Sequence, residues 1–222
     1  MKFNQAFTSN NKIFLNDFQY IFWDFDGVIK DSIELKSNAF FKLFSSFGND
    51  LAIRVRSHHE KNGGLSRFEK LPIYLRWAGE NPSDKLISDY CQKFSNIVKQ
   101  DVIDSEWVPG VHEFIIKKNK KSLFFIVTAI PQGEIEEILT DLKIMPYFEE
   151  VIGAPTKKYE AIMKLLGQYS IKPKDSIMIG DSDSDFYAAK DNSVKFVLRR
   201  TKYNINLQKE LNCFKINDFR GL

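Results

Sequence analysis

Short apolar segments that each stop at a polar residue or a glycine constrain the fold of this chain most strongly. Residues 123–127 form an unbroken apolar run, which is typical of a strand buried on both faces of a parallel sheet. The other predicted strands are mostly aliphatic or aromatic, and they lie at 19–23, 151–152, 177–179 and 195–198. Segments with helical spacing alternate with these strands, at 133–142, 158–168 and 184–190. The alternation predicts an α/β fold with a Rossmann-like, mostly parallel sheet covered by helices.

The region that follows the first predicted strand is expected to be helical. It contains no convincing strand between about residues 50 and 107. Its clearest amphipathic segments lie at 67–77 and 83–98. We therefore predict two domains, because a long helical region interrupts an otherwise alternating chain. The predicted domains are a core formed by residues 1–31 and 108–222 and a helical domain, which we call the insert, formed by residues 32–107.

Polar residues stand directly after the predicted strands. Asp24, Thr128 and Asp181 each follow an apolar run, and Lys158 begins the helix after the weaker strand at 151–152. In an open parallel sheet the ligand crevice lies beyond the carboxyl ends of the strands. We therefore expect these four residues to converge on one site, although more than a hundred positions separate the first from the last.

Two further carboxylates are expected at this site. Asp26 joins it through the turn after the first strand, and Asp185 lies one helical turn beyond Asp181. Carboxylates gathered this closely raise one another's pKa values or need a cation between them. All the candidate ligands are oxygen atoms, so a hard divalent ion is favoured, and Mg²⁺ fits best. Such an ion usually also binds a substrate phosphate.

Four ordered motifs resemble those of the haloacid dehalogenase-like superfamily. In chain order they are WDFDGV at residues 23–28, Val127-Thr128, Lys158 and GDSDSD at residues 180–185. The resemblance covers about residues 19–200. The insert looks like the helical cap of the phosphoglycolate phosphatase and β-phosphoglucomutase branch. This resemblance implies a Mg²⁺-dependent phosphatase that hydrolyses a small phosphate monoester, such as a sugar phosphate or a related metabolite.

The resemblance also implies roles for single residues. Asp24 would attack phosphorus and form an aspartyl-phosphate, and Asp26 would act first as the general acid and then as the base. Thr128 and the backbone amide of Ala129 would hold phosphoryl oxygens, and Lys158 would balance charge. The implied metal ligands are the carboxylates of Asp24, Asp181 and Asp185 and the main-chain carbonyl of Asp26.

The third motif offers two adjacent lysines, Lys157 and Lys158. Neighbouring residues on a helix point about a quarter-turn apart, so only one of them should enter the site. The spacing from Gly153-Ala154-Pro155 in similar sequences favours Lys158.

Residues 58–67 of the insert resemble the substrate-facing loop of β-phosphoglucomutase-like caps, in which a glycine precedes Ser-Arg. Arg67 is the candidate for contact with a substrate anion. The other candidate substrate-binding residues are Asn62, Gly63, Ser66 and Ala129. A structural alternative stays open for Arg67, since it could pair with one of three acidic residues of the insert, Glu60, Glu69 or Asp84. For His58 and His59, a surface or loop role is as plausible as substrate contact.

Several alternative functions stay open at this point. A phosphomutase would pass the phosphoryl group to a second hydroxyl of the substrate instead of to water. A protein of another class would keep the fold and bind phosphate ligands without turnover. Action on a nucleic-acid end has only weak support, from the lysine cluster at residues 117–121.

Composition excludes other classes. The chain has 32 Lys and Arg against 29 Asp and Glu, a net charge of +3, so no nucleic-acid partner is expected. Its two cysteines lack the spacing of a disulfide framework or a zinc site. We see no secretory leader and no apolar run as long as a membrane span, so we expect a cytoplasmic protein without a membrane partner. The expected partner is a small-molecule phosphate ester. The oligomeric state has no sequence signal.

Overall fold

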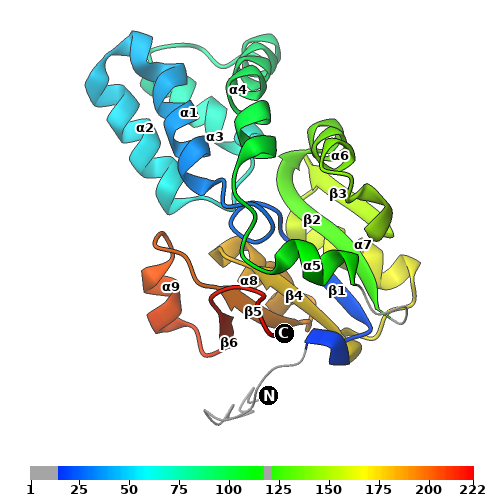
Figure 1. The fold of residues 1–222 in the computed structure, drawn as a ribbon. Coiled ribbons are helices and arrows are strands. Elements are labelled where there is room, and N and C mark those ends of the chain that lie inside the picture. The colour runs from blue at the N-terminus through cyan, green and yellow to red at the C-terminus, as the bar shows by residue number, and fades with distance from the viewer. Residues whose placement is uncertain (1–14, 118–121) are drawn as a thin grey trace.

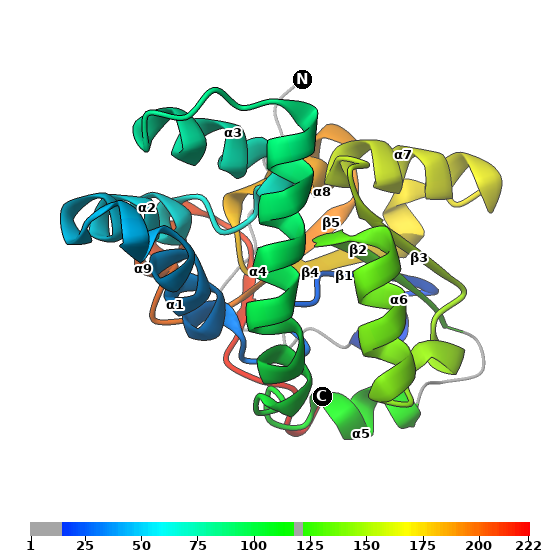
Figure 2. The ribbon, with the colours of Figure 1, turned by 90° about the horizontal axis from the view of Figure 1, so that it is seen from above.

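A six-stranded parallel sheet forms the centre of the structure (Figures 1 and 2), with the strand order β3-β2-β1-β4-β5-β6. The structure is a computed structural model and describes residues 15–117 and 122–222. The strands are β1 (Tyr20–Trp23), β2 (Leu123–Pro131), β3 (Glu150–Ala154), β4 (Ser176–Gly180), β5 (Lys195–Arg199) and β6 (Phe214–Ile216). The α/β, Rossmann-like fold expected from the alternating sequence pattern is confirmed.

Both faces of the sheet are buried, which explains the unbroken apolar runs of the sequence. In β1, Ile21 and Trp23 belong to one hydrophobic cluster and Phe22 to the other. Helices α5 (Val111–Ile116) and α6 (Gln132–Asp141) contribute side chains to the first cluster. Helices α7 (Lys158–Gln168) and α8 (Asp183–Asp191) contribute to the second. The sheet is thus the middle layer of three.

The insert carries four α-helices that lie together beyond the carboxyl ends of the central strands (Figure 1). They are α1 (Ile33–Phe44), α2 (Asn49–Lys61), α3 (Arg67–Trp77) and α4 (Asp84–Asp104). Aromatic rings fill the space between them: the ring centroid of Phe40 lies 4.1 Å from that of Phe94 and 5.5 Å from that of Tyr74. The interior of the insert is therefore aromatic, and it belongs to the same hydrophobic cluster as one face of the sheet.

The two connections between the insert and the sheet run side by side. The backbone N–H of Asp31 donates to the carbonyl of Glu106 at 2.9 Å, and that of Val108 donates to the carbonyl of Ile29 at 3.0 Å. The division into domains at residues 31/32 and 107/108 stays a prediction, but both boundaries fall within this paired connection.

Several elements differ from the sequence expectation. Strand β2 continues past Thr128 to Pro131, because after a register shift Pro131 pairs with Ala154 of β3. Residues 58–61, which we took for part of a loop, form the last turn of α2. The signal for α2 was weak, since two of its three buried residues, Ala52 and Val55, are small and the third is a histidine. The short helix α9 (Ile205–Glu210) and strand β6 were not expected at all.

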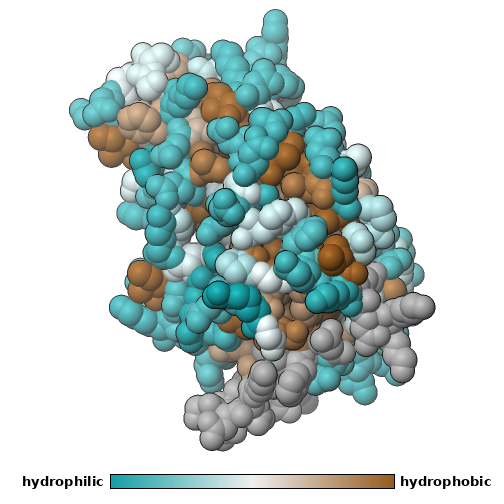
Figure 3. Space-filling view, viewed as in Figure 1, coloured by the Kyte–Doolittle hydropathy of each residue, from teal (hydrophilic) through white to brown (hydrophobic). Residues whose placement is uncertain are grey.

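Hydrophilic residues cover most of the face shown in Figure 3, and hydrophobic residues are scattered among them. Within the described part of the chain, no helix has the length and apolar character needed to cross a membrane. The lysine cluster at 117–121 lies outside the described residues, apart from Lys117, which is exposed at the end of α5.

Candidate active site

The register of the sheet brings distant motifs together. Trp23, the last residue of β1, is level with Ile126 of β2 and Ile179 of β4. Asp24 and Asp181 follow at neighbouring strand ends, and the Asp24 N–H donates to the Ile179 carbonyl at 3.0 Å. The convergence expected from the strand ends is therefore present in the structure.

Gly27 permits the turn that follows Asp24. Its φ is +72°, and a Cβ at this position would lie 2.5 Å from Oδ2 of Asp181 and 2.7 Å from the side chain of Ile33. Any larger residue would push the turn away from the carboxylate. The glycine of the first motif thus determines how closely the first and fourth motifs approach.

Three carboxylates and one lysine form the centre of the site. Asp24, Asp181 and Asp185 each offer an oxygen, and these oxygens lie within 4.8 Å of one another. Lys158 Nζ lies 2.9 Å from Asp24 Oδ2 and 2.7 Å from Asp185 Oδ1. Asp24, Asp185 and Lys158 are buried, and Asp181 is half-buried.

The carboxylates hold more negative charge than Lys158 neutralises. Burial, followed by the Asp185 charge, raises the pKa of Asp24 to about 7. Burial and the Asp24 charge likewise raise the pKa of Asp181 well above its ordinary value. Burial alone would lower the pKa of Lys158, but the carboxylates of Asp185 and Asp24 raise it overall. A buried oxygen cluster with excess negative charge is suited to a hard divalent cation.

Asp185 is fixed from both sides. Its Oδ2 accepts hydrogen bonds from the backbone N–H of Ser182 at 3.1 Å and from Ser182 Oγ at 2.6 Å, as a capping box at the start of α8. Its Oδ1 accepts from Lys158. The helix cap and the ion pair together leave this side chain little freedom.

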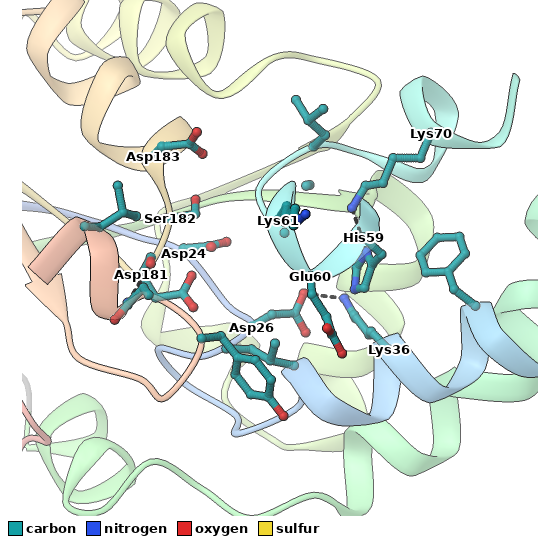
Figure 4. A pocket seen from close by; sticks show the side chains of 18 of the residues that line it. Asp24, Asp26, Lys36, His59, Glu60, Lys61, Lys70, Asp181, Ser182 and Asp183 are labelled. Atoms are coloured by element: carbon teal, nitrogen blue, oxygen red, sulfur yellow. Dashed lines mark hydrogen bonds and ion pairs between the residues drawn. The ribbon is translucent and has the colours of Figure 1, made fainter. Parts of the chain in front are cut away.

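Asp26 lines a cavity that Asp24 and Lys158 also line, and its side chain lies beside the insert (Figure 4). Its Oδ1 accepts a hydrogen bond from Ser32 Oγ at 2.6 Å, and its Oδ2 forms an ion pair with Lys36 of α1. The side chain of Asp26 is therefore connected to the first helix of the insert.

Thr128 and Ala129 lie at the irregular part of β2. Thr128 is buried, and its Oγ1 accepts a hydrogen bond from the Ile130 N–H at 3.4 Å. Ala129 lines the same cavity as Asp24 and Lys158. Within the ambiguous lysine pair, Lys158 reaches the carboxylates, whereas Lys157 is exposed at the residue before α7.

The insert residues singled out by the resemblance lie in different surroundings. Gly63 and Arg67 line the cavity. The side-chain amide of Asn62 donates to the His58 carbonyl at 2.8 Å. Ser66 caps α3 in a capping box with Glu69. Asn62 and Ser66 thus have local structural roles, and their contact with substrate stays a prediction.

The guanidinium of Arg67 already has acidic and hydroxyl partners. It donates to both carboxylate oxygens of Glu134 in α6, at 2.6 and 2.8 Å, and to Ser95 Oγ at 2.6 Å. The pair is almost fully buried, with side-chain exposures of 4% and 8%. Contact between Arg67 and a substrate anion stays a prediction. Among the structural alternatives, the acidic partner is Glu134 rather than any of the three acidic residues of the insert.

Several side chains of the insert that we did not assign to the site also line its cavity, among them Lys36, His59 and Lys70. Lys70 and His59 are buried, and Lys70 Nζ lies 2.9 Å from His59 Nδ1. A sequence signal for Lys70 did exist: it follows Arg67 at helical spacing and precedes the buried Leu71 and Tyr74, so it falls on the apolar face of α3.

Comparisons with known proteins agree with this geometry. A family model described as haloacid dehalogenase-like hydrolase matches residues 21–198. A phosphorylated carbohydrates phosphatase from Thermotoga maritima is 25% identical over 185 residues, which cover 79% of this chain and 82% of that protein. A phosphoglycolate phosphatase from Pseudomonas fluorescens is 26% identical over 216 residues, which cover 91% of this chain and 77% of that protein.

A solved structure of β-phosphoglucomutase from Clostridium difficile is similar in fold. Its TM-score is 0.73 at 20% sequence identity, over 92% of this chain and 93% of that one. Because the family model matches most of the chain and its motifs meet at one site, the chain belongs to the haloacid dehalogenase-like hydrolase family.

Proposed function

We propose that this hydrolase is a Mg²⁺-dependent phosphatase that acts on a small phosphate monoester through an aspartyl-phosphate. The observation that carries the proposal is the placement of Asp24 beside Lys158 and within a cluster of carboxylates. The phosphatase names of the relatives from Thermotoga maritima and Pseudomonas fluorescens support it. Both alignments cover most of this chain and most of the relative, which supports the proposal too.

Mg²⁺ would be held by the carboxylates of Asp24, Asp181 and Asp185 and by the main-chain carbonyl of Asp26. The donor set fits, because oxygen ligands of this kind suit a small hard cation. Burial, together with the charge of the neighbouring carboxylates, raises the pKa values of Asp24 and Asp181, and a bound cation would offset both effects. When bound, the ion supplies positive charge to the carboxylates and to the substrate phosphate.

In the first step an oxygen of Asp24 forms a bond to phosphorus, and the bond from phosphorus to the ester oxygen breaks. Asp26, in its protonated form, gives a proton to the leaving oxygen. Lys158 orients Asp24 and offsets negative charge. Thr128 and the amide of Ala129 hold phosphoryl oxygens.

In the second step water attacks the phosphorus of the aspartyl-phosphate, and the acyl phosphate bond breaks to release inorganic phosphate. Asp26 takes the proton from this water, which restores its protonated form. The contacts with Ser32 and Lys36 hold the Asp26 carboxylate in place. Helix α1 of the insert thereby takes part in positioning the general acid and base.

The insert, residues 32–107, acts as a cap domain over a core formed by residues 1–31 and 108–222. The shared cavity supports this division, since side chains of both regions line it. A cap that excludes water also limits the size of the ester, and the cavity of about 590 Å³ suits a small molecule.

The phosphomutase alternative is not favoured. The curated relatives at 25% and 26% identity carry phosphatase names, and the similarity to β-phosphoglucomutase at 20% identity concerns the fold. Release of inorganic phosphate from a panel of phosphate monoesters, with Mg²⁺ and with a chelator, tests the proposal. We expect metal-dependent release, and its absence across the panel would rule out the phosphatase.

A further inference from the structure

Asp26 lies in a tight turn between β1 and α1. The N–H groups of Ile29 and Lys30 both donate to the Phe25 carbonyl, at 2.8 and 3.2 Å. The Gly27 N–H donates to the Lys30 carbonyl at 2.7 Å, and Asp26 and Lys30 form a β-bridge. The backbone of Lys30 therefore closes the turn in which Asp26 lies.

The side chain of Lys30 anchors this turn to the end of helix α4. Lys30 does not line the active-site cavity, and its exposed fraction is 1%. Its Nζ donates to the Ile103 carbonyl at 2.9 Å, in the last turn of α4, and lies 4.5 Å from the ring centroid of Trp107. Carbonyl groups in the last turn of a helix lack intrahelical partners and carry partial negative charge, so a lysine is suited to this place.

The charge of Lys30 is held without a direct ion pair. None of the ion pairs in the described part of the chain includes Lys30. Burial lowers its pKa, and the charges of Glu106 and Asp104 oppose this shift. A buried ammonium group is costly unless it is hydrogen-bonded, so the bond to the Ile103 carbonyl determines where this side chain lies.

Two contacts join this anchor to the side chain of Asp26. The β-bridge fixes the Asp26 backbone relative to Lys30. Ser32 Oγ, which donates to Asp26 Oδ1 at 2.6 Å, lies 3.4 Å from the Lys30 carbonyl. A shift of Lys30 would therefore move both the backbone of Asp26 and one of its hydrogen-bond partners.

Packing alone does not explain a lysine at this position. An apolar side chain of similar length would fill the same space without the cost of a buried charge. The hydrogen bond adds a fixed direction, and catalysis is sensitive to direction, since a displacement of about 1 Å can cost about a hundredfold in rate.

We propose that Lys30 is a positioning residue for the general acid, and that it holds the turn of Asp26 against the end of α4. This rests on the proposed function, because Asp26 is assigned there as the residue that protonates the leaving oxygen. Lys30 contacts neither the substrate nor the metal in this role. Its loss should impair the first step most where the leaving oxygen needs a proton.

Ethyl phosphate and acetyl phosphate separate this role from a general loss of structure. Both carry a neutral two-carbon group, but ethanol needs a proton as it leaves, whereas acetate leaves as a stable anion. The value of kcat/KM reports the formation of the aspartyl-phosphate and not its hydrolysis. We expect Lys30→Met to lower kcat/KM for ethyl phosphate by about tenfold or more and to leave that for acetyl phosphate within about twofold.

Two further variants calibrate the result. Lys85→Met is the matched control, because Lys85 is exposed at the opposite end of α4 and the charge change is the same. It should change neither value. Asp26→Asn removes the proton donor itself, so it should lower kcat/KM for ethyl phosphate by about a hundredfold or more and affect acetyl phosphate far less. Lys30→Gln repeats the test if Lys30→Met does not fold.

Two results overturn the inference: Lys30 variants that lower both values by the same factor, or Lys30 variants that leave both values unchanged. Failure of the proposed function looks different. In that case the wild-type enzyme with Mg²⁺ releases no phosphate from the two esters or from p-nitrophenyl phosphate.

Discussion

At the scale of single residues, the arrangement of the site depends on which charged side chains form ion pairs with one another. Lys158 bridges Asp24 and Asp185, while Lys157, its neighbour, is exposed. We expect Lys158→Met to lower kcat by at least about a hundredfold, because the carboxylates lose their fixed cation, and Lys157→Met to stay within about twofold. Steady-state phosphate release checks both, and a larger loss for Lys157→Met would reverse the assignment.

The burial of Lys70 should make the thermal stability of the protein depend on pH. The pKa of Lys70 is about 7 in the folded protein and 10.5 in its ordinary state, so the unfolded chain holds the proton more tightly. Stability is therefore lost as the pH falls from 10.5 towards 7. Lys70→Met removes this loss and is expected to raise the melting temperature more at about pH 7 than at about pH 10. Equal shifts at both pH values would contradict this.

Sequence reasoning located the clustered carboxylates of the candidate site but not every partner. Asp24 and Asp181 were found because strand ends in a parallel sheet must meet at one edge. The partner of Arg67 was not found, since Glu134 lies 67 positions away on α6 and no local pattern joins them. Lys70 was missed because a lysine within a helix is usually exposed.

At the scale of elements, close approach of the insert to α8 depends on one glycine. A Cβ on Gly64 would lie 2.0 Å from Ser184 Oγ and 2.5 Å from Ser182 Oγ, and the Gly64 carbonyl accepts from Ser184 at 3.2 Å. We expect Gly64→Ala to lower the free energy of unfolding by about 1–3 kcal/mol. Chemical denaturation measures this value.

Gly63→Ala is the matched control. A Cβ at Gly63 would meet no heavy atom within 4 Å among the described residues. We expect its unfolding free energy to stay close to that of the wild type. If both alanine variants were equally destabilised, the contact with α8 would not explain the loss at Gly64.

Elements with strong apolar periodicity were predictable and the others were not. Residues 67–77 and 158–168 were expected as helices, and α3 and α7 have these bounds. Helix α9 has no buried residue, so its sequence carries no apolar stripe. Yet α9 contributes Asn206 and Leu207 to the lining of the cavity, so this short element is part of the candidate site.

At the scale of the whole molecule, the carboxylate cluster links metal binding to folding. A cation that binds only the folded protein stabilises it and relieves repulsion among Asp24, Asp181 and Asp185. At about 100 times its dissociation constant, Mg²⁺ should raise the melting temperature by about 5 °C or more. Asp181→Asn should reduce this rise. An unchanged melting temperature in millimolar Mg²⁺ would contradict the metal site.

The formation of a phosphoryl bond to Asp24 is the central claim, and mass spectrometry of the acid-quenched enzyme tests it most directly. After a brief reaction with a turned-over ester and Mg²⁺, we expect the peptide that contains Asp24 to gain the mass of one phosphoryl group. Asp24→Asn should show no gain and lose at least about a thousandfold in kcat, because an amide is a poor nucleophile. Turnover with no phosphorylated peptide, together with an active Asp24→Asn variant, would contradict the account.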